Sequence, residues 1–178
     1  GGPAGLMAAG QSAGTGAETL LLEKMDRAGV KLRITGHGRC NLTNADSVRE
    51  AIKRFPAGGY FVRPALYSLS NQALRTFFAE RGVPTEVQRG GRIFPVSEDA
   101  RDIVAALTRW VDEQGVTLRV HSAVTDLVVE AGQLTGVRVA DGRVYRADAV
   151  VVATGGASYP ATGSSGDGYR LAESVGHT

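Results

Sequence analysis

The stretch GGPAGLMAA at residues 1–9, with the apolar run TLLL at residues 19–22 ending on Glu23, decides the fold. The spacing fits the dinucleotide-binding pattern G-x-G-x-x-G, with its second and third glycines at Gly2 and Gly5 and its first just before residue 1. This pattern places a pyrophosphate at a helix N-terminus, and an acidic residue about 20 residues later holds a ribose. It predicts a nucleotide site at Gly2, Pro3, Ala4, Gly5 and Glu23. An Ala/Gly-rich helix after a turn would give similar glycines.

Composition indicates one globular core. The 178 residues are 43% hydrophobic, and the net charge of +2 comes from interspersed charges without a polybasic tail. A pI of 8.9 leaves an anionic substrate possible. Cys40 is the only cysteine, which excludes an internal disulfide framework and Cys-rich zinc sites and fits a reducing, cytoplasmic location. No stretch predicts a membrane helix or a signal peptide, so we expect no membrane partner.

The beginning of the sequence predicts a longer protein. A dinucleotide fold needs a buried strand before its first glycine, and the 178 residues start inside the motif. We therefore expect a piece without its first strand.

Patterning predicts a β-α unit first: a helix over residues 3–13, a buried parallel strand over 17–23, and then a long loop over 24–44. Helices follow at 46–54 and 71–81, the second capped by Ser70. The next expected elements are a hairpin of 85–89 with 92–95, then a helix capped by Ser97 and carrying Ile103, Val104, Leu107, Trp110 and Val111 toward the core.

Period-two alternation then predicts a β-meander of strands at 117–120, 124–130, 135–140 and 143–145. A continuous apolar run at 147–153 predicts a second buried parallel strand, and a final helix begins near Gly168 and runs to the end. The expected class is α/β and Rossmann-like. Its segments are the fingerprint and loop at 1–44, a helical part with a hairpin at 45–116, the meander at 117–146 and the second strand with its glycine-rich sequel at 147–178.

Four strings carry a family resemblance: KLRITGHGRCNLTN at 31–44, RGGRIFPVS at 89–97, ATGGASYP at 153–160 and GSSGDGY at 163–169. With the opening motif, they resemble the HI0933-like or BaiN-like family of bacterial NAD(P)/FAD-dependent oxidoreductases, which includes aminoacetone oxidase-like flavoproteins. The resemblance covers essentially the whole chain. It implies a glutathione-reductase-like FAD-binding domain truncated at both ends, with the substrate domain absent.

The resemblance also implies cofactor contacts. Gly2 and Gly5 would face the FAD pyrophosphate, Glu23 and Lys24 its adenosine ribose, and the loop from Lys31 to Asn41 the flavin half. Backbone N–H groups near Gly36 and Gly38 can approach an anionic cofactor, and Lys31 and Arg39 can neutralise it. A loop merely rich in turn formers is the alternative. The full implied set adds Thr35, Cys40 and Asn41 from this loop, then Val124, Ala153, Thr154, Gly155 and Asp167.

Some residues depart from the family pattern, and others are not expected to be catalytic. Ala28 to Lys31 replaces a common Pro-Gly-Arg-Lys, which removes one basic contact. His37 is expected to face solvent, and Cys40, without a CxxC partner, to be a buried structural thiol. Ser164 and Ser165 are better explained as turn residues than as catalytic nucleophiles. No catalytic acid or base is nominated.

The resemblance implies hydride transfer through flavin from NAD(P)H to an unsaturated small molecule, with a steroid-like enoyl reductase as the family's usual activity. One alternative is a flavin-dependent nucleobase or RNA reductase, although no RNP-like string or basic helix indicates RNA. Another is a non-catalytic adenine-nucleotide module, which would need only the opening motif and Glu23. The substrate and the oligomeric state stay open.

Overall fold

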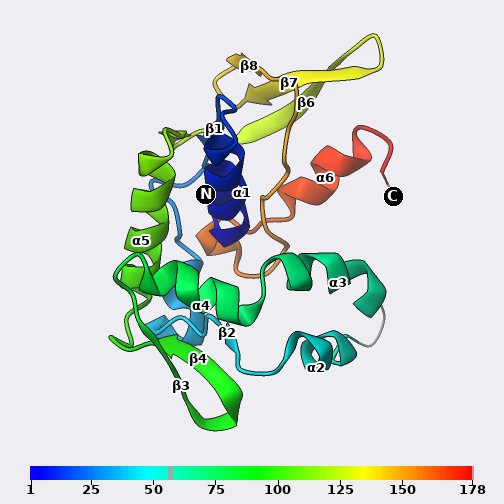
Figure 1. The fold of residues 1–178 in the computed structure, drawn as a ribbon. Coiled ribbons are helices and arrows are strands. Elements are labelled where there is room, and N and C mark those ends of the chain that lie inside the picture. The colour runs from blue at the N-terminus through cyan, green and yellow to red at the C-terminus, as the bar shows by residue number, and fades with distance from the viewer. Residues whose placement is uncertain (56–57, 178) are drawn as a thin grey trace. The chain divides into compact units, whose positions relative to one another are not determined.

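The computed structural model describes residues 1–55 and 58–177 (Figure 1). The chain forms two compact units: residues 1–32 with 107–178, and residues 33–106. Within the described residues, no helix is long and apolar enough to cross a membrane. The same residues hold no cluster of three or more His, Cys, Asp or Glu side chains placed to bind a metal ion.

A parallel strand pair and one helix form the centre of the first unit. Helix α1 (Pro3–Gly14) is followed by β1 (Leu20–Leu22), which pairs in parallel with β5 (Thr117–Arg119). The buried side of α1 carries Leu6, which is fully enclosed. The predicted helix and strand are therefore confirmed, although the strand is shorter than expected.

The first unit also holds a three-stranded antiparallel meander, β6 (Val124–Glu130), β7 (Gln133–Val139) and β8 (Val144–Arg146), in that order. The meander prediction is confirmed for these strands and wrong for residues 117–120, because β5 pairs with β1 instead. Alternation identifies a strand but not the sheet that it joins.

The predicted buried strand at 147–153 is wrong. These residues form no strand, and Val151 is 72% exposed and Val152 45% exposed. A strand needs a neighbour to receive its backbone hydrogen bonds, and within the described residues only the Ala147 N–H has such a partner, the Thr135 carbonyl of β7 at 3.0 Å. An apolar run alone cannot supply that neighbour.

The chain then passes through the turn η3 (Pro160–Thr162) into α6 (Asp167–Glu173). The expectation that this last helix continues to the end is wrong. It ends at Glu173, and the Ser174 hydroxyl donates to the Leu171 carbonyl, which satisfies one of the terminal acceptors.

A small antiparallel sheet organises the second unit. Its order is β2 (Thr43–Asn44), β4 (Arg92–Pro95), β3 (Thr85–Val87), and β3 and β4 are joined through the turn η2 (Arg89–Gly91). The hairpin prediction is thus confirmed. The loop predicted over residues 24–44 contains more structure than expected, namely the turn η1 (Leu32–Gly38) and β2. Short turns and two-residue strands depend on partners that local sequence does not reveal.

Helices α2 (Val48–Lys53) and α4 (Asn71–Ala79) occupy the predicted positions. The predicted cap of α4 is confirmed, since Ser70 accepts from the Ala73 N–H. A third helix, α3 (Gly59–Ser68), was not predicted. It begins at Gly59, contains Pro64 and buries no residue. Its apolar residues recur at helical spacing, at Val62, Ala65, Leu66 and Leu69, but the adjacent glycines and the proline inside the segment favour a loop.

Helix α5 (Ala100–Glu113) begins in the second unit and ends in the first. Its predicted apolar residues are all buried: Ile103, Val104, Leu107, Trp110 and Val111. The predicted cap at Ser97 is wrong. Asp99 performs that role, because its Oδ1 accepts from the Arg101 N–H, 2.8 Å away.

Candidate cofactor-binding site

The N-terminus of α1 leaves backbone N–H donors unpaired beside open space. Pro3 stands at its first turn, and no side chain caps the helix at Gly2, so the first backbone N–H groups lack an internal partner. A Cβ added at Gly2 would meet no other atom within 4 Å. The space beside this glycine is therefore open to a ligand, which fits a pyrophosphate at the helix N-terminus.

Gly5 lies on the opposite side of the same turn, against the parallel strands. A Cβ there would lie 3.5 Å from the Leu21 side chain and 3.5 Å from the Ala153 Cβ, which is ordinary packing contact. Gly5 thus lies where the fingerprint predicts, between helix and sheet, and the packing by itself does not demand glycine.

Glu23 ends β1 beside the glycine-rich turn. Its Oε1 accepts from the Met25 N–H at 2.7 Å, and its Oε2 lies 3.0 Å from the Gly1 nitrogen. The side chain is 13% exposed. These contacts orient a carboxylate next to the fingerprint, where a ribose hydroxyl could donate to it.

Lys24 and Asp167 meet across most of the sequence. The Lys24 ammonium donates to the Asp167 carboxylate at 2.6 Å and to the Ser165 hydroxyl, which itself donates to Asp167 at 3.1 Å. The hydrogen bond from Lys24 lowers the pKa of the Asp167 carboxyl below its ordinary value, and the bond from Ser165 acts in the same direction. Asp167 is therefore held as the anion.

A second lysine reaches the same C-terminal segment. The Lys31 ammonium donates to the Ser158 carbonyl at 3.0 Å and to the Ser158 hydroxyl at 2.9 Å, and it lies 3.4 Å from the Ser164 hydroxyl. It also lies 5.8 Å from the centre of the Tyr159 ring. Lys24 and Lys31 together tie the segment that follows β1 to residues 158–167.

The remaining predicted contacts of the first unit divide into two groups. Ala153 lies against Gly5, and the following Thr154 and Gly155 lead from it toward Ser164, whose Oγ would be 3.0 Å from a Cβ at Gly155. Val124 instead starts β6, opposite Val139. In Figure 1 the orange segment before α6 runs beside the blue β1 and α1.

The second unit holds the tight turn of the predicted flavin loop. The Cys40 N–H donates to the Thr35 carbonyl at 2.9 Å, and Gly36 has a φ of 56°. A Cβ at Gly36 would lie 2.8 Å from the Asn41 backbone nitrogen, so this position demands glycine for both reasons. Gly38 is also left-handed, at 86°.

Arg39 is anchored by protein groups. Its Nη1 lies 2.7 Å from the Glu98 carboxylate and 3.3 Å from the Gln88 side-chain oxygen, and its guanidinium lies 4.4 Å from the centre of the Phe94 ring. The loop also contains Arg33, whose Nε is buried without a hydrogen-bond partner among the described residues. A buried donor without a partner is a candidate to bind a ligand. Arg33 is therefore a better candidate than Arg39 to contact an anionic ligand, because Arg39 already binds Glu98 and Gln88.

Two expectations about loop side chains are confirmed. His37 is exposed, and Cys40 is buried. Burial raises the pKa of the Cys40 thiol, although a hydrogen bond with Thr35 partly opposes the shift. Cys40 is therefore a structural thiol and not a thiolate nucleophile.

Sequence reasoning missed the roles of three serines, which accept hydrogen bonds from the ammonium groups of Lys24 and Lys31: Ser158, Ser164 and Ser165. The glycine-rich setting of these serines indicates turns, and nothing local pairs them with lysines more than a hundred residues away. Arg33 was also missed. The only signal for it is its place inside the KLRITG string.

Comparisons with known proteins show the family of this chain. The family described as "HI0933-like protein Rossmann domain" matches residues 1–178. The chain is 36% identical to a 3-dehydro-bile acid delta(4,6)-reductase of Clostridium scindens, over 100% of the chain and 43% of the relative. It is 28% identical to a ribosomal RNA dihydrouridine synthase of Haemophilus influenzae, over 98% of the chain and 43% of the relative. The chain thus spans less than half the length of these curated relatives.

Solved structures share the fold. The 3-ketosteroid-delta4-(5alpha)-dehydrogenase of Rhodococcus jostii RHA1 superposes with a TM-score of 0.63 at 17% identity, covering 86% of this chain and 44% of that one. THI4 of Thermovibrio ammonificans gives a TM-score of 0.60 at 20% identity, over 91% of this chain and 58% of that one. The Rossmann-like class predicted from the sequence is confirmed.

Proposed function

Since the chain belongs to the HI0933-like Rossmann-domain family, we propose that it is the FAD-binding part of an oxidoreductase. The proposal is carried by one arrangement in the first unit. The uncapped N-terminus of α1, the open side of Gly2 and the Glu23 carboxylate lie together, as a dinucleotide requires.

The residues fit FAD in distinct roles. The N–H groups at Gly2 to Gly5 would hold the pyrophosphate, and Glu23 would accept from the adenosine ribose. Asp167, fixed by Lys24, would contact the chain between phosphate and flavin. Thr35 to Asn41 with Lys31 would approach the flavin half, with Arg33 as an added donor.

When bound, the flavin supplies hydride transfer, while the protein orients it and sets its electrostatic surroundings. We propose NAD(P)H as the donor and a carbon–carbon double bond as the acceptor. The names of the curated relatives support the acceptor only, because they describe reduction of such a bond, in a bile acid or in uridine. A steroid-like acceptor is favoured by the higher identity to the bile acid reductase. A nucleobase acceptor is the second candidate, supported by two relatives named ribosomal RNA dihydrouridine synthase.

The test is an absorbance spectrum of the intact protein purified without added cofactor, followed by heat release of any chromophore. Twin flavin bands with released FAD are expected. A colourless protein that FAD cannot reconstitute would overturn the proposal and favour an adenine-nucleotide module. If FAD is present, bleaching by NADH or NADPH identifies the donor, and a bile acid enone or a uridine oligonucleotide then identifies the acceptor by restoring the oxidised spectrum.

A further inference from the structure

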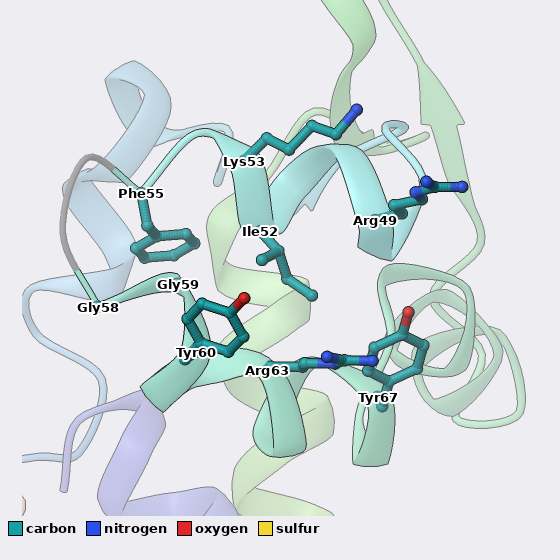
Figure 2. Close-up of a pocket in the computed structure, with 9 residues that line it drawn as sticks. All are labelled: Arg49, Ile52, Lys53, Phe55, Gly58, Gly59, Tyr60, Arg63 and Tyr67. Atoms are coloured by element: carbon teal, nitrogen blue, oxygen red, sulfur yellow. The ribbon is translucent and has the colours of Figure 1, made fainter.

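Helices α2 and α3 frame an open groove in the second unit (Figure 2). Arg49, Ile52 and Lys53 come from α2, and Tyr60, Arg63 and Tyr67 come from α3. Figure 2 shows Ile52 reaching toward α3, with the three α3 side chains in a row, while the Lys53 ammonium points away toward the rim. Ile52 packs against the start of α3, where a Cβ at Gly59 would lie 3.3 Å from its Cγ2, but neither helix buries any residue fully, and Tyr60 stays 88% exposed.

The α3 row alternates aromatic and cationic groups on one helix face. Tyr60, Arg63 and Tyr67 are spaced i, i+3 and i+7, and the row is about 10 Å long at the helical rise per residue. Tyr60 is 88% exposed and Tyr67 57% exposed, and the Arg63 guanidinium lies 5.7 Å from the Tyr67 ring. Exposed aromatic rings at this density indicate a binding surface.

The cations of the groove are not neutralised by the protein. Among described residues, no carboxylate lies within ion-pair distance of Arg49, Lys53 or Arg63, whereas the neighbouring Arg54 pairs with Asp46. No acidic residue lines the groove. The second unit as a whole, residues 33–106, carries eleven Lys and Arg against seven Asp and Glu, although the full chain is only at +2. The ligand is therefore expected to be anionic.

We propose that this groove binds a segment of single-stranded nucleic acid. Bases stack on exposed aromatic rings regardless of sequence, and cations beside those rings contact the phosphates. A row of this length takes about two or three nucleotides. A single apolar acid would need an enclosed, mostly apolar pocket and one cation. The groove is open, and it is lined by Arg49 and Arg63 with Lys53 at its rim. This site is separate from the fingerprint and does not depend on flavin.

The test is fluorescence anisotropy of a labelled uridine octamer with the intact protein. We expect saturable binding whose affinity falls with salt, with a log–log slope of about −2 for three cations. Tyr60→Ala and Tyr67→Ala should each weaken binding about 5- to 150-fold, the range expected for loss of one stacked base. Tyr60→Phe should retain binding, because the ring remains. Arg63→Gln should reduce both the affinity and the salt slope.

Matched controls lie on the same two helices outside the groove. Phe61→Ala removes an equally exposed ring next to Tyr60, and Arg54→Gln removes a cation from the end of α2. Both are expected to bind like the unaltered protein, and circular dichroism of every variant verifies folding. The proposal is overturned if the octamer does not bind, if the controls lose as much affinity as the groove variants, or if NADPH or a bile acid displaces the octamer as well as unlabelled oligonucleotide does. The flavin spectrum is recorded on the same samples, so failure of cofactor binding is seen independently.

Discussion

The Lys24 ammonium lies 2.6 Å from the Asp167 carboxylate, although 143 positions separate them in sequence. One residue follows the first strand and the other starts the last helix, so the pair connects the two ends of the first unit. Both were assigned to the cofactor on the strength of short motifs. Their contact with each other adds a structural role, because it fixes Asp167 as an anion before any ligand arrives.

This pair predicts a pH-dependent stability. The pKa of Asp167 is lowered in the folded state, so the pair stabilises the protein above the ordinary carboxyl value of 3.8 and is lost as the pH falls below it. Its side chains are 26% and 31% exposed, which limits the contribution to under about 1 kcal/mol. Asp167→Asn should lower the melting temperature at pH 7 and have little effect at pH 3. An equal loss at both values would contradict the assignment.

Glu23 is predicted to control cofactor affinity. Removing a carboxylate that accepts from a ribose hydroxyl costs about 1.5–3 kcal/mol, or roughly 10- to 150-fold in Kd. Glu23→Gln should therefore weaken FAD binding in a titration of the deflavinated protein. Glu18→Gln is the control, because Glu18 is exposed shortly before the same strand. Equal affinity of the two variants would remove Glu23 from the site.

Gly10 is predicted to be intolerant of any side chain. A Cβ there would lie 2.4 Å from ring atoms of the buried Trp110, so Gly10→Ala forces the helix or the ring to move, at about 1–3 kcal/mol. Gly14→Ala is the matched substitution in α1. Its Cβ would meet only the flexible end of Gln114, and alanine favours the helix. Thermal unfolding should show a lower melting temperature for the first variant only.

Cys40 is predicted to react slowly with thiol reagents. It is buried, and burial raises the pKa of its thiol, so little thiolate is exposed near neutral pH. Cys40 is the only cysteine of these 178 residues, so a chromogenic disulfide reagent applied to this chain reports on it alone. The folded protein should be labelled far more slowly than the protein in denaturant. Immediate stoichiometric labelling of the folded protein would show that the flavin loop opens readily.

The sequence by itself determined the elements whose signal is local. The glycines of residues 1–9 and the leucines before Glu23 sufficed for α1 and β1, because a fingerprint helix and a buried strand each carry their pattern within a few residues. The same holds for the β3–β4 hairpin and for the buried face of α5 with Trp110. These features follow from turn chemistry and periodicity.

Only the tertiary structure decided which elements become partners. It paired residues 117–119 with β1 and left residues 148–153 without a partner strand, because hydrogen bonding between strands depends on distant neighbours and not on apolar content. It also joined Lys24 to Asp167 and Lys31 to Ser158, and it placed α3 beside α2. A side chain's partner is fixed by where the folded backbone brings it, and local sequence does not encode that position.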